Sequence, residues 1–224
     1  MSLSKYKSIY QKVYQANQDD ERFCLICNKK LNEQNTLESL FIQEELICEE
    51  CKAQLIVHRK IYEIDGIDFY VYYEYNEFLE RIWFRYKEQK DIVLKNLFSK
   101  LFEPYLKNTY CICIPPSSDE KRRERAFEPL IAILGNRTYS PLYKMKSIKQ
   151  SKQSFLKRKA IQEVIQRKAC YPLPDKPVVL VDDVCTSQST INRCIELLHP
   201  EKVFIFAAHP LWIESKNLEK HRPF

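Results

Sequence analysis

VVLVDDVCTSQST, residues 178–190, is the most informative stretch of this chain. Its first four residues are apolar without interruption, which is typical of a central strand in a parallel sheet, because such a strand is buried on both faces. A helical pattern from Ser189 to about Leu198 follows, and the apolar run from Val203 to Ala208 predicts the next strand. Strands that alternate with helices predict an α/β domain built on a parallel sheet.

The same stretch carries candidate binding residues. Asp182 and Asp183 stand at the carboxyl end of the predicted strand, where open α/β sheets bind ligands. Their carboxylates can accept hydrogen bonds from vicinal sugar hydroxyls or hold a hydrated Mg²⁺. The pattern predicts a site for a phosphate joined to a ribose, and an acidic strand end followed by a helix N-cap is the simpler alternative. Backbone N–H groups at the start of the next helix favour an anion, and four side chains beside them add hydroxyl donors: Thr186, Ser187, Ser189 and Thr190.

Composition narrows the classes of protein further. The chain has 224 residues, enough for one domain or for one domain with a small appendage, and 45% of them are hydrophobic. It contains two glycines, Gly66 and Gly135, where average usage would give roughly fifteen, so the glycine-rich phosphate loops of Rossmann and P-loop proteins are excluded. No apolar run approaches the roughly 20 residues of a membrane-spanning helix, and the polar start lacks the core of a signal peptide. We therefore expect a soluble, cytoplasmic protein without membrane insertion.

Residues 68–114 supply further predicted elements. Asp68 to Tyr73 is rich in aromatic and β-branched residues and predicts a strand. A helical pattern begins at the candidate cap Asn76, resumes after a charged interruption, and ends near Pro104. Its aromatic residues favour a role in the core over a base-stacking surface. Tyr110 to Ile114 predicts a short buried strand that ends at two prolines.

The chain becomes more polar beyond these prolines. We expect a loop from Ser117 to Arg125, a helix at about 127–134, a strand within 138–146 and a basic helix over 150–168. A strongly basic segment is typical of a surface that faces phosphates, and equally of a solvated face in a lysine-rich protein. Between residues 144 and 168 a single acid accompanies the following basic residues: Lys144, Lys146, Lys149, Lys152, Lys157, Arg158, Lys159, Arg167 and Lys168.

Four cysteines near the N-terminus form two Cys-x-x-Cys pairs, Cys24 with Cys27 and Cys48 with Cys51. Paired cysteines in a chain without an export signal are typical of metal ligands rather than disulfides. Two matched pairs at this spacing predict a closed, tetrahedral structural Zn²⁺ site, and a redox-active dithiol is the alternative. A module this small cannot bury a sufficient core alone, so the metal would supply its folding energy. We therefore expect an N-terminal arm with the zinc module over residues 1–64 and the α/β domain over residues 65–224.

The stretch 178–190 resembles the 5-phosphoribosyl-1-pyrophosphate (PRPP) signature of type I phosphoribosyltransferases. Together with the four-cysteine module, it makes the chain similar to the ComF family of bacterial late-competence proteins over most of residues 22–209. The resemblance implies a type I phosphoribosyltransferase-like parallel sheet flanked by helices. Weaker landmarks lie between the two motifs: Tyr73 and Tyr75, Lys87 and Asp91, Ile114-Pro115, Arg125-Ala126-Phe127-Glu128, and the basic stretch from Lys149 to Gln153.

The resemblance also implies roles for individual residues. Asp182 and Asp183 would contact the ribose hydroxyls of PRPP or of a nucleotide. The following turn would wrap the 5-phosphate with Thr186, Ser187, Gln188, Ser189 and Thr190. The pyrophosphate, with Mg²⁺, would lie against a second set: Pro116, Ser117, Lys121, Arg122, Arg123 and Arg125. The implied function is support of single-stranded DNA uptake during natural transformation, with a helicase-like ATPase as partner.

Three positions depart from the family motifs. Gln188 and Ala126 stand where the family has glycine, which favours a positive φ, and Glu128 stands where the family has asparagine. These departures argue against turnover, so we assign no catalytic residue. The alternative function is a zinc-containing nucleic-acid-binding adaptor with a vestigial, non-catalytic PRPP pocket.

Overall fold

The structure is a computed structural model that describes residues 22–31, 46–102, 106, 109–145, 165–216 and 220–223. Its contacts divide the chain into two compact units, residues 1–52 and residues 53–224. The division falls before strand β1 (Val57–Ile64), whereas the sequence-based boundary places those residues with the zinc module. β1 lies with the α/β unit because it pairs along its length with strand β2 (Ile67–Glu74).

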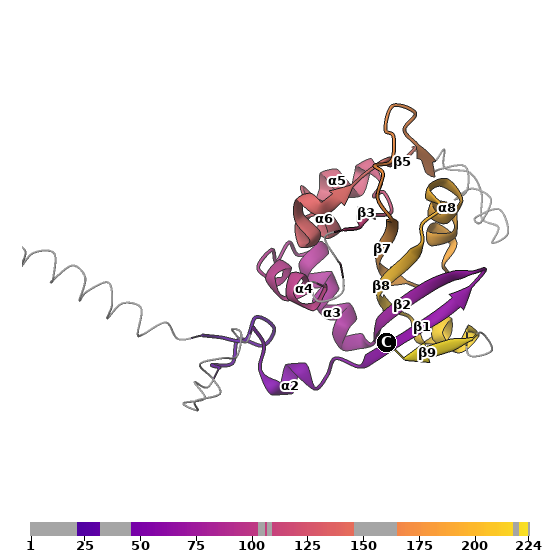
Figure 1. The fold of residues 1–224 in the computed structure, drawn as a ribbon. Coiled ribbons are helices and arrows are strands. Elements are labelled where there is room, and N and C mark those ends of the chain that lie inside the picture. The colour runs from indigo at the N-terminus through magenta and orange to yellow at the C-terminus, as the bar shows by residue number, and fades with distance from the viewer. Residues whose placement is uncertain are drawn as a thin grey trace, which may run out of the picture. The chain divides into compact units, whose positions relative to one another are not determined.

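The second unit is built on a mixed sheet, which has seven strands among the described residues (Figure 1). The order of neighbouring strands is β4-β3-β7-β8-β2-β1-β9. The strands from β4 to β2 pair in parallel, and β1 pairs antiparallel with both β2 and β9. The predicted α/β class is thus confirmed, with a sheet that is mixed rather than wholly parallel. The other bounds are β3 Cys111–Cys113, β4 Thr138–Tyr139, β7 Val178–Cys185, β8 Lys202–Ala208 and β9 His221–Pro223.

Helices cover both faces of the central strands. Figure 1 shows α3 (Glu77–Lys87), α4 (Leu94–Phe102) and α6 (Pro129–Leu134) on one side of the sheet and α8 (Ser189–Leu198) on the other. None of the helices in the described part of the chain is both long and apolar enough to cross a bilayer. The shorter helices are α2 Glu49–Lys52 in the first unit, α5 Asp119–Arg125, the 3-10 turn η3 Gly135–Arg137, and α9 Pro210–Ser215.

Strand β8 shows why its sequence reads as one continuous apolar run. Successive strand residues point to opposite faces of a sheet, and both faces of β8 are covered. On one face Phe206 lies edge-on to Trp83 and Phe98, at ring-centroid distances of 5.4 and 5.5 Å. On the other face Ile205 belongs to the same buried cluster as Ile191 of α8. The aromatic residues of α3 and α4 are therefore core residues, as predicted, except for Phe84, which is exposed.

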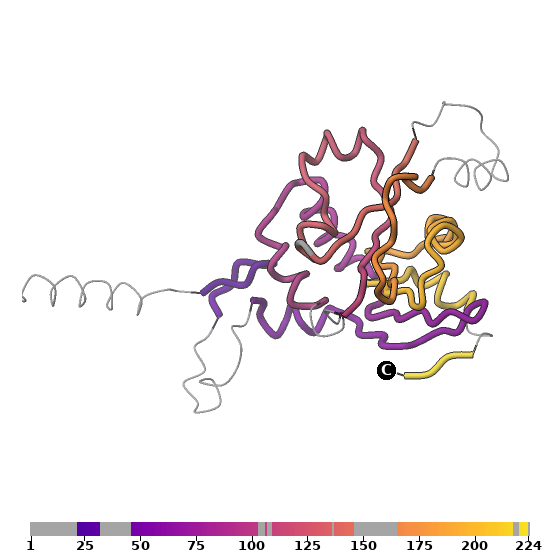
Figure 2. The backbone as a smooth tube through the Cα atoms, turned by 45° about the horizontal axis from the view of Figure 1, so that its top comes forward, coloured from indigo at the N-terminus to yellow at the C-terminus, as the bar shows by residue number. Residues whose placement is uncertain are grey.

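The far edge of the sheet is formed by β9. It pairs with β1 over three residues, and Figure 2 shows it running beside the β1–β2 hairpin. All three residues of β9 are exposed. A cap predicted from the sequence is also confirmed: Asn76 precedes α3, and its Oδ1 accepts a hydrogen bond from the N–H of Leu79 at 2.9 Å.

Two stretches differ from their predicted structure. The expected loop from Ser117 to Arg125 contains α5, which buries no side chain and so has no apolar periodicity to reveal it. Strand β6 (Ile165–Arg167) pairs antiparallel with β5 (Leu142–Lys144), so a helix over the last part of 150–168 is wrong. The rest of that predicted basic helix, residues 150–164, lies outside the described residues, as does the N-terminal arm before residue 22.

Candidate functional site

The acidic pair Asp182-Asp183 lies inside strand β7, near its carboxyl end. β7 continues to Cys185, which pairs in register with Ala208 of β8. Pairing continues through the acids because ladder hydrogen bonds are made by the backbone. The turn that joins β7 to α8 is therefore residues 186–188, shorter than the loop over residues 183–188 that the sequence predicts.

Asp183 is held from two sides. Its Oδ1 accepts a hydrogen bond from the N–H of Val184 at 2.7 Å, and its Oδ2 accepts one from the ammonium of Lys87 at the end of α3. The Lys87 ammonium also lies over the face of Trp83, 4.5 Å from the ring centroid. The side chains of Lys87 and Asp183 are 16% and 21% exposed, so solvent ions screen this pair less than they would a surface pair.

Asp182 ionises less readily than an ordinary aspartate. Its Oδ1 accepts the N–H of Asp183 at 2.9 Å. Burial, and then the negative charge of Asp183, raise the pKa of Asp182 to about 7, although the hydrogen bond and the Lys87 ammonium act in the opposite direction. Near neutral pH this carboxyl therefore exchanges between its neutral and charged forms.

Two pockets meet at the acidic pair, and Asp182 and Asp183 line both of them. The first, the proline-side pocket, has a volume of about 220 Å³ and is bounded by the turn at 115–117. The second, the turn pocket, has a volume of about 210 Å³ and is bounded by the turn at 186–188. A ligand with an anionic group in each pocket would have to pass the two carboxylates between them.

The turn pocket gathers most of the residues predicted to hold a 5-phosphate. Thr186, Ser187, Gln188 and Thr190 all line it. The fifth, Ser189, is not among the lining residues, and its Oγ accepts a hydrogen bond from Ser187 Oγ at 3.3 Å. The structure thus brings four of the five predicted side chains to one pocket with the acidic pair.

Gln188 takes the backbone conformation that glycine favours. Its φ is 59°, in the left-handed region, so the turn keeps that geometry although the family glycine is absent. Both the oxygen and the nitrogen of the Gln188 side-chain amide form hydrogen bonds. The indole N–H of Trp212 donates to Gln188 Oε1 at 3.0 Å, and Gln188 Nε2 donates to Asn192 Oδ1 at 2.8 Å.

The proline-side pocket receives only part of the predicted pyrophosphate set. Pro116, Ser117 and Arg125 line it, whereas Arg122 and Arg123 are not among the lining residues. A terminal nitrogen of Arg125 donates to Glu88 Oε1. The Nε of Arg125 is buried and has no hydrogen-bond partner within the described residues, so this donor is unsatisfied in the folded chain.

Glu128, at the family asparagine position, also lines the proline-side pocket. Its Oε1 accepts a hydrogen bond from Arg122 Nε at 2.6 Å, and its Oε2 accepts one from Ser117 Oγ at 2.8 Å. A carboxylate therefore lies on the wall of the pocket in which the resemblance places the pyrophosphate of the ligand. Its charge is partly balanced by Arg122.

The same pocket is lined by Lys121, which the resemblance places at the pyrophosphate, and by two lysines that were not predicted as site residues, Lys87 and Lys144. Burial, and then the positive charge of Lys121, lower the pKa of Lys144. Lys144 is the first residue of the basic segment 144–168. That segment is the signal in the sequence from which a role for Lys144 at an anion site could have been predicted. Lys87 lies 96 residues before Asp183, so only the folded topology reveals their contact.

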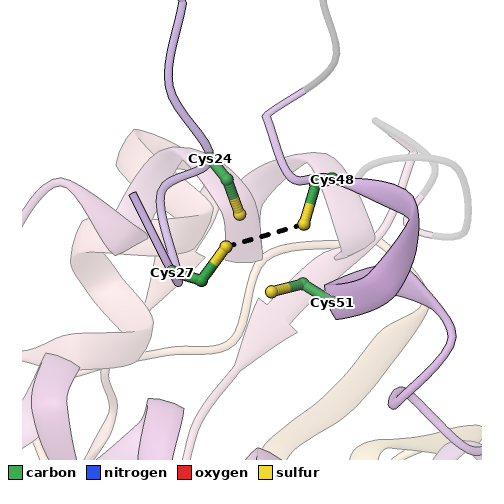
Figure 3. Close-up of side chains that lie close together, drawn as sticks. All are labelled: Cys24, Cys27, Cys48 and Cys51. Carbon is green, nitrogen blue, oxygen red and sulfur yellow. Dashed lines mark hydrogen bonds between the residues drawn. The ribbon is translucent and has the colours of Figure 1, made fainter. Parts of the chain in front are cut away.

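In the first unit, the four predicted metal ligands converge (Figure 3). The sulfur atoms of Cys24, Cys27, Cys48 and Cys51 all lie within 4.8 Å of one another, and Cys27 Sγ is 3.6 Å from Cys48 Sγ. Four thiolates around one zinc are about 3.8 Å apart, since each Zn–S bond is about 2.3 Å long. Burial opposes ionisation of Cys24, but backbone hydrogen bonds to its sulfur outweigh burial and lower its pKa to about 6. The geometry suits a closed four-sulfur metal centre.

The remaining cysteines and the histidines form no comparable cluster in the described ranges. Cys111, Cys113 and Cys194 are buried in the core, as predicted. Cys185 is buried as the last residue of β7, and burial raises its pKa, so its thiol is poorly suited to reactivity at the pocket.

Comparisons with known proteins agree with this architecture. No protein-family model matches the chain. It is 24% identical over 188 residues to competence protein ComFC of Streptococcus pneumoniae (strain ATCC BAA-255 / R6), an alignment that spans 80% of this chain and 82% of that protein. The four-cysteine cluster and the mostly parallel sheet are consistent with the alignment. The chain is a distant homologue of competence protein ComFC.

Proposed function

We propose that this chain binds PRPP, or a nucleotide that shares its ribose and phosphate, across the proline-side and turn pockets. One observation carries the proposal: Asp182 and Asp183 line both pockets. PRPP carries a phosphate at one end of a ribose and a pyrophosphate at the other. The spacing of two anion sites on either side of a carboxylate pair suits that order of groups.

Each part of the ligand has complementary groups. The hydroxyls of Thr186, Ser187 and Thr190 suit the 5-phosphate, and the two carboxylates suit the ribose hydroxyls. The proline-side pocket offers the side chain of Arg125 and the ammonium groups of its lysines to a pyrophosphate. We assign no group that activates an acceptor base, so the proposal is binding rather than turnover.

Calorimetric titration of PRPP with Mg²⁺ tests the proposal. The wild-type protein should release heat and saturate, and the double variant Asp182→Ala/Asp183→Ala should lose most of the affinity. A matched double variant, Asp175→Ala/Glu201→Ala, removes two exposed acids outside the pockets and should bind normally. Identical absence of heat in wild type and the pocket variant, both shown to be folded by circular dichroism, would rule out this ligand site.

The four-cysteine centre is proposed to hold a structural Zn²⁺. Its support is the convergence of four sulfurs at metal-ligand distances. Four protein ligands leave no open coordination position, so the zinc would stabilise the first unit rather than react with a substrate.

The place of this chain in natural transformation is also a proposal and rests on the ComFC homology. We propose that it supports single-stranded DNA uptake together with a helicase-like ATPase. DNA contacts through Lys and Arg would make affinity fall steeply with salt. Anisotropy of a labelled oligothymidine at increasing salt measures this slope, and absence of binding at low salt would remove the DNA role.

The adaptor with a vestigial pocket is the second candidate function. Glu128 favours it, because a carboxylate on the wall of the proline-side pocket opposes a bound pyrophosphate. Binding of DNA that is salt-sensitive, combined with no binding of PRPP, would select the adaptor. Binding of both would select the first proposal.

A further inference from the structure

The positive charge beside the acidic pair is supplied by a side chain of the protein, the ammonium of Lys87. Lys87 ends α3, and its neighbours Trp83 and Tyr86 are buried, so the backbone that carries this lysine is well fixed. Its ammonium donates to Asp183 Oδ2 and lies 4.5 Å from the ring centroid of Trp83. Lys87 also lines the proline-side pocket, so it faces the carboxylate and the open space together.

The acidic pair has few free oxygens for a divalent metal. Mg²⁺ requires oxygen ligands at about 2.0–2.1 Å in nearly octahedral geometry. Asp183 Oδ2 holds the Lys87 ammonium, Asp183 Oδ1 accepts the Val184 N–H, and Asp182 Oδ1 accepts the Asp183 N–H. Three of the four carboxylate oxygens are thus engaged by donors. Mg²⁺ bound to Asp183 Oδ2 would have to displace the ammonium, so the side chains as arranged disfavour a carboxylate-bound Mg²⁺.

The side chains that line the proline-side pocket have a net positive formal charge. Its charged lining residues are four cations, Lys87, Lys121, Arg125 and Lys144, and three acids, Glu128, Asp182 and Asp183, a formal sum of +1. The lowered pKa of Lys144 reflects burial and the nearby charge of Lys121. A bound pyrophosphate group would relieve the repulsion between Lys144 and Lys121 without an added metal ion.

We propose that Lys87 is the resident cation of the site and takes the place of Mg²⁺ between the acidic pair and the pyrophosphate of the ligand. An ammonium has three N–H donors, so one can stay on Asp183 while the others contact phosphoryl or ribose oxygens. Binding of PRPP therefore does not require a divalent metal. This inference rests on the proposed PRPP site and specifies where its positive charge comes from.

The test is calorimetric titration of PRPP into the full-length protein in two buffers, one with excess Mg²⁺ and one freed of metals on a chelating resin. Free chelator is avoided because it would strip the four-cysteine centre. For wild type, the two dissociation constants should agree within about threefold. For Lys87→Gln, affinity in the metal-free buffer should fall about tenfold or more, the range for a lost charge-assisted hydrogen bond. Mg²⁺ should restore part of the lost affinity, because Asp183 no longer holds an ammonium in this variant and can bind the metal.

Two further variants keep the experiment decisive. Lys87→Met retains an unbranched side chain over Trp83, so it separates loss of charge from loss of packing if Lys87→Gln unfolds. Lys95→Gln removes an exposed lysine of α4 and should bind as wild type does. Binding by wild type in Mg²⁺ buffer alone would overturn the role of Lys87 and leave the PRPP site intact. Full affinity of Lys87→Gln without metal would overturn it too, whereas no binding in either buffer would reject the PRPP site and this inference with it.

Discussion

Ala126 and Gln188 are non-glycine residues with φ values of 63° and 59°. A side chain in the left-handed region costs roughly 1–2 kcal/mol relative to glycine. For Gln188, hydrogen bonds to Trp212 and Asn192 offset this cost. Ala126 has no polar side-chain atom that could provide such compensation. The two turns are thus held by different means.

Substitution Ala126→Gly should therefore raise the free energy of unfolding by about 1 kcal/mol. The residue is the C-cap of α5, a position that glycine commonly occupies. Urea denaturation measures the change. Ala132→Gly, inside α6, should instead lower stability by about 1 kcal/mol, because glycine is unfavourable within a helix. A destabilised Ala126→Gly protein would contradict the strain at this position.

Replacement of Glu128 by Gln should strengthen PRPP binding about threefold or more, because it removes one negative charge from the proline-side pocket. The amide oxygen of glutamine can still accept the hydrogen bond from Ser117. Titration calorimetry gives the affinity, with Glu124→Gln in the exposed part of α5 as the control. Equal or weaker binding by Glu128→Gln would show that the carboxylate does not oppose the ligand.

The raised pKa of Asp182 predicts a pH-dependent stability. Since its pKa is about 7 in the folded protein and 3.8 in its ordinary state, the folded protein binds more protons between these values. The contribution of Asp182 to the free energy of unfolding is therefore fully present below about pH 4 and is lost as the pH rises through about 7. Asp183 and Lys87 are the charged groups that face it.

Asp182→Asn should remove that dependence. Relative to wild type, the variant should gain about 1 kcal/mol or more between pH 5 and pH 8, since one unit of pKa difference corresponds to about 1.4 kcal/mol. Urea denaturation at the two pH values provides the comparison, and the exposed Asp175→Asn is the control. The same stability difference at both pH values would mean that Asp182 is not perturbed.

Among the helices and strands, local pattern predicted those with a buried face. The apolar runs at 178–181 and 203–208 gave β7 and β8, and the spacing after Asn76 gave α3. α5 was missed because it has no buried side chain, and its signals are the Ser118 cap with acids in the first turn. β7 extends through Asp182 and Asp183 because backbone pairing with β8 continues there, which side-chain type does not show.

The candidate site was predictable where it is continuous in sequence. The acidic pair and four of the five turn residues were found, because they lie within nine residues of one another. Lys87 was recognised as a landmark but not as part of the site. Its contact with Asp183 depends on how α3 packs against the sheet, and no local pattern encodes that distance.

The two Cys-x-x-Cys turns and α2 should depend on the metal for their structure. Full-length protein is expected to contain about one zinc per chain, and Cys27→Ser should lose most of it, because one of four ligands is removed. Metal analysis by mass spectrometry measures the content. Cys170→Ser changes an exposed cysteine outside the cluster and should keep the zinc. Unchanged zinc in Cys27→Ser would place the metal elsewhere.

For the molecule as a whole, the division into two units predicts separable responses. Every residue that lines the two pockets belongs to the second unit. Removal of zinc by a chelator should therefore expose the first unit to trypsin while PRPP affinity changes less than about twofold, since no ligand of the metal lines either pocket. Parallel loss of PRPP binding would mean that the two units are energetically coupled.

The wall shared by the proline-side and turn pockets has a practical consequence for inhibitor discovery. Because Asp182 and Asp183 separate two spaces of similar volume, two small fragments should be able to occupy them at the same time. A linker that passes the acids would make the second binding event intramolecular, so the tethered compound should bind far more tightly than either fragment. Polar linkers that donate hydrogen bonds would suit that passage best.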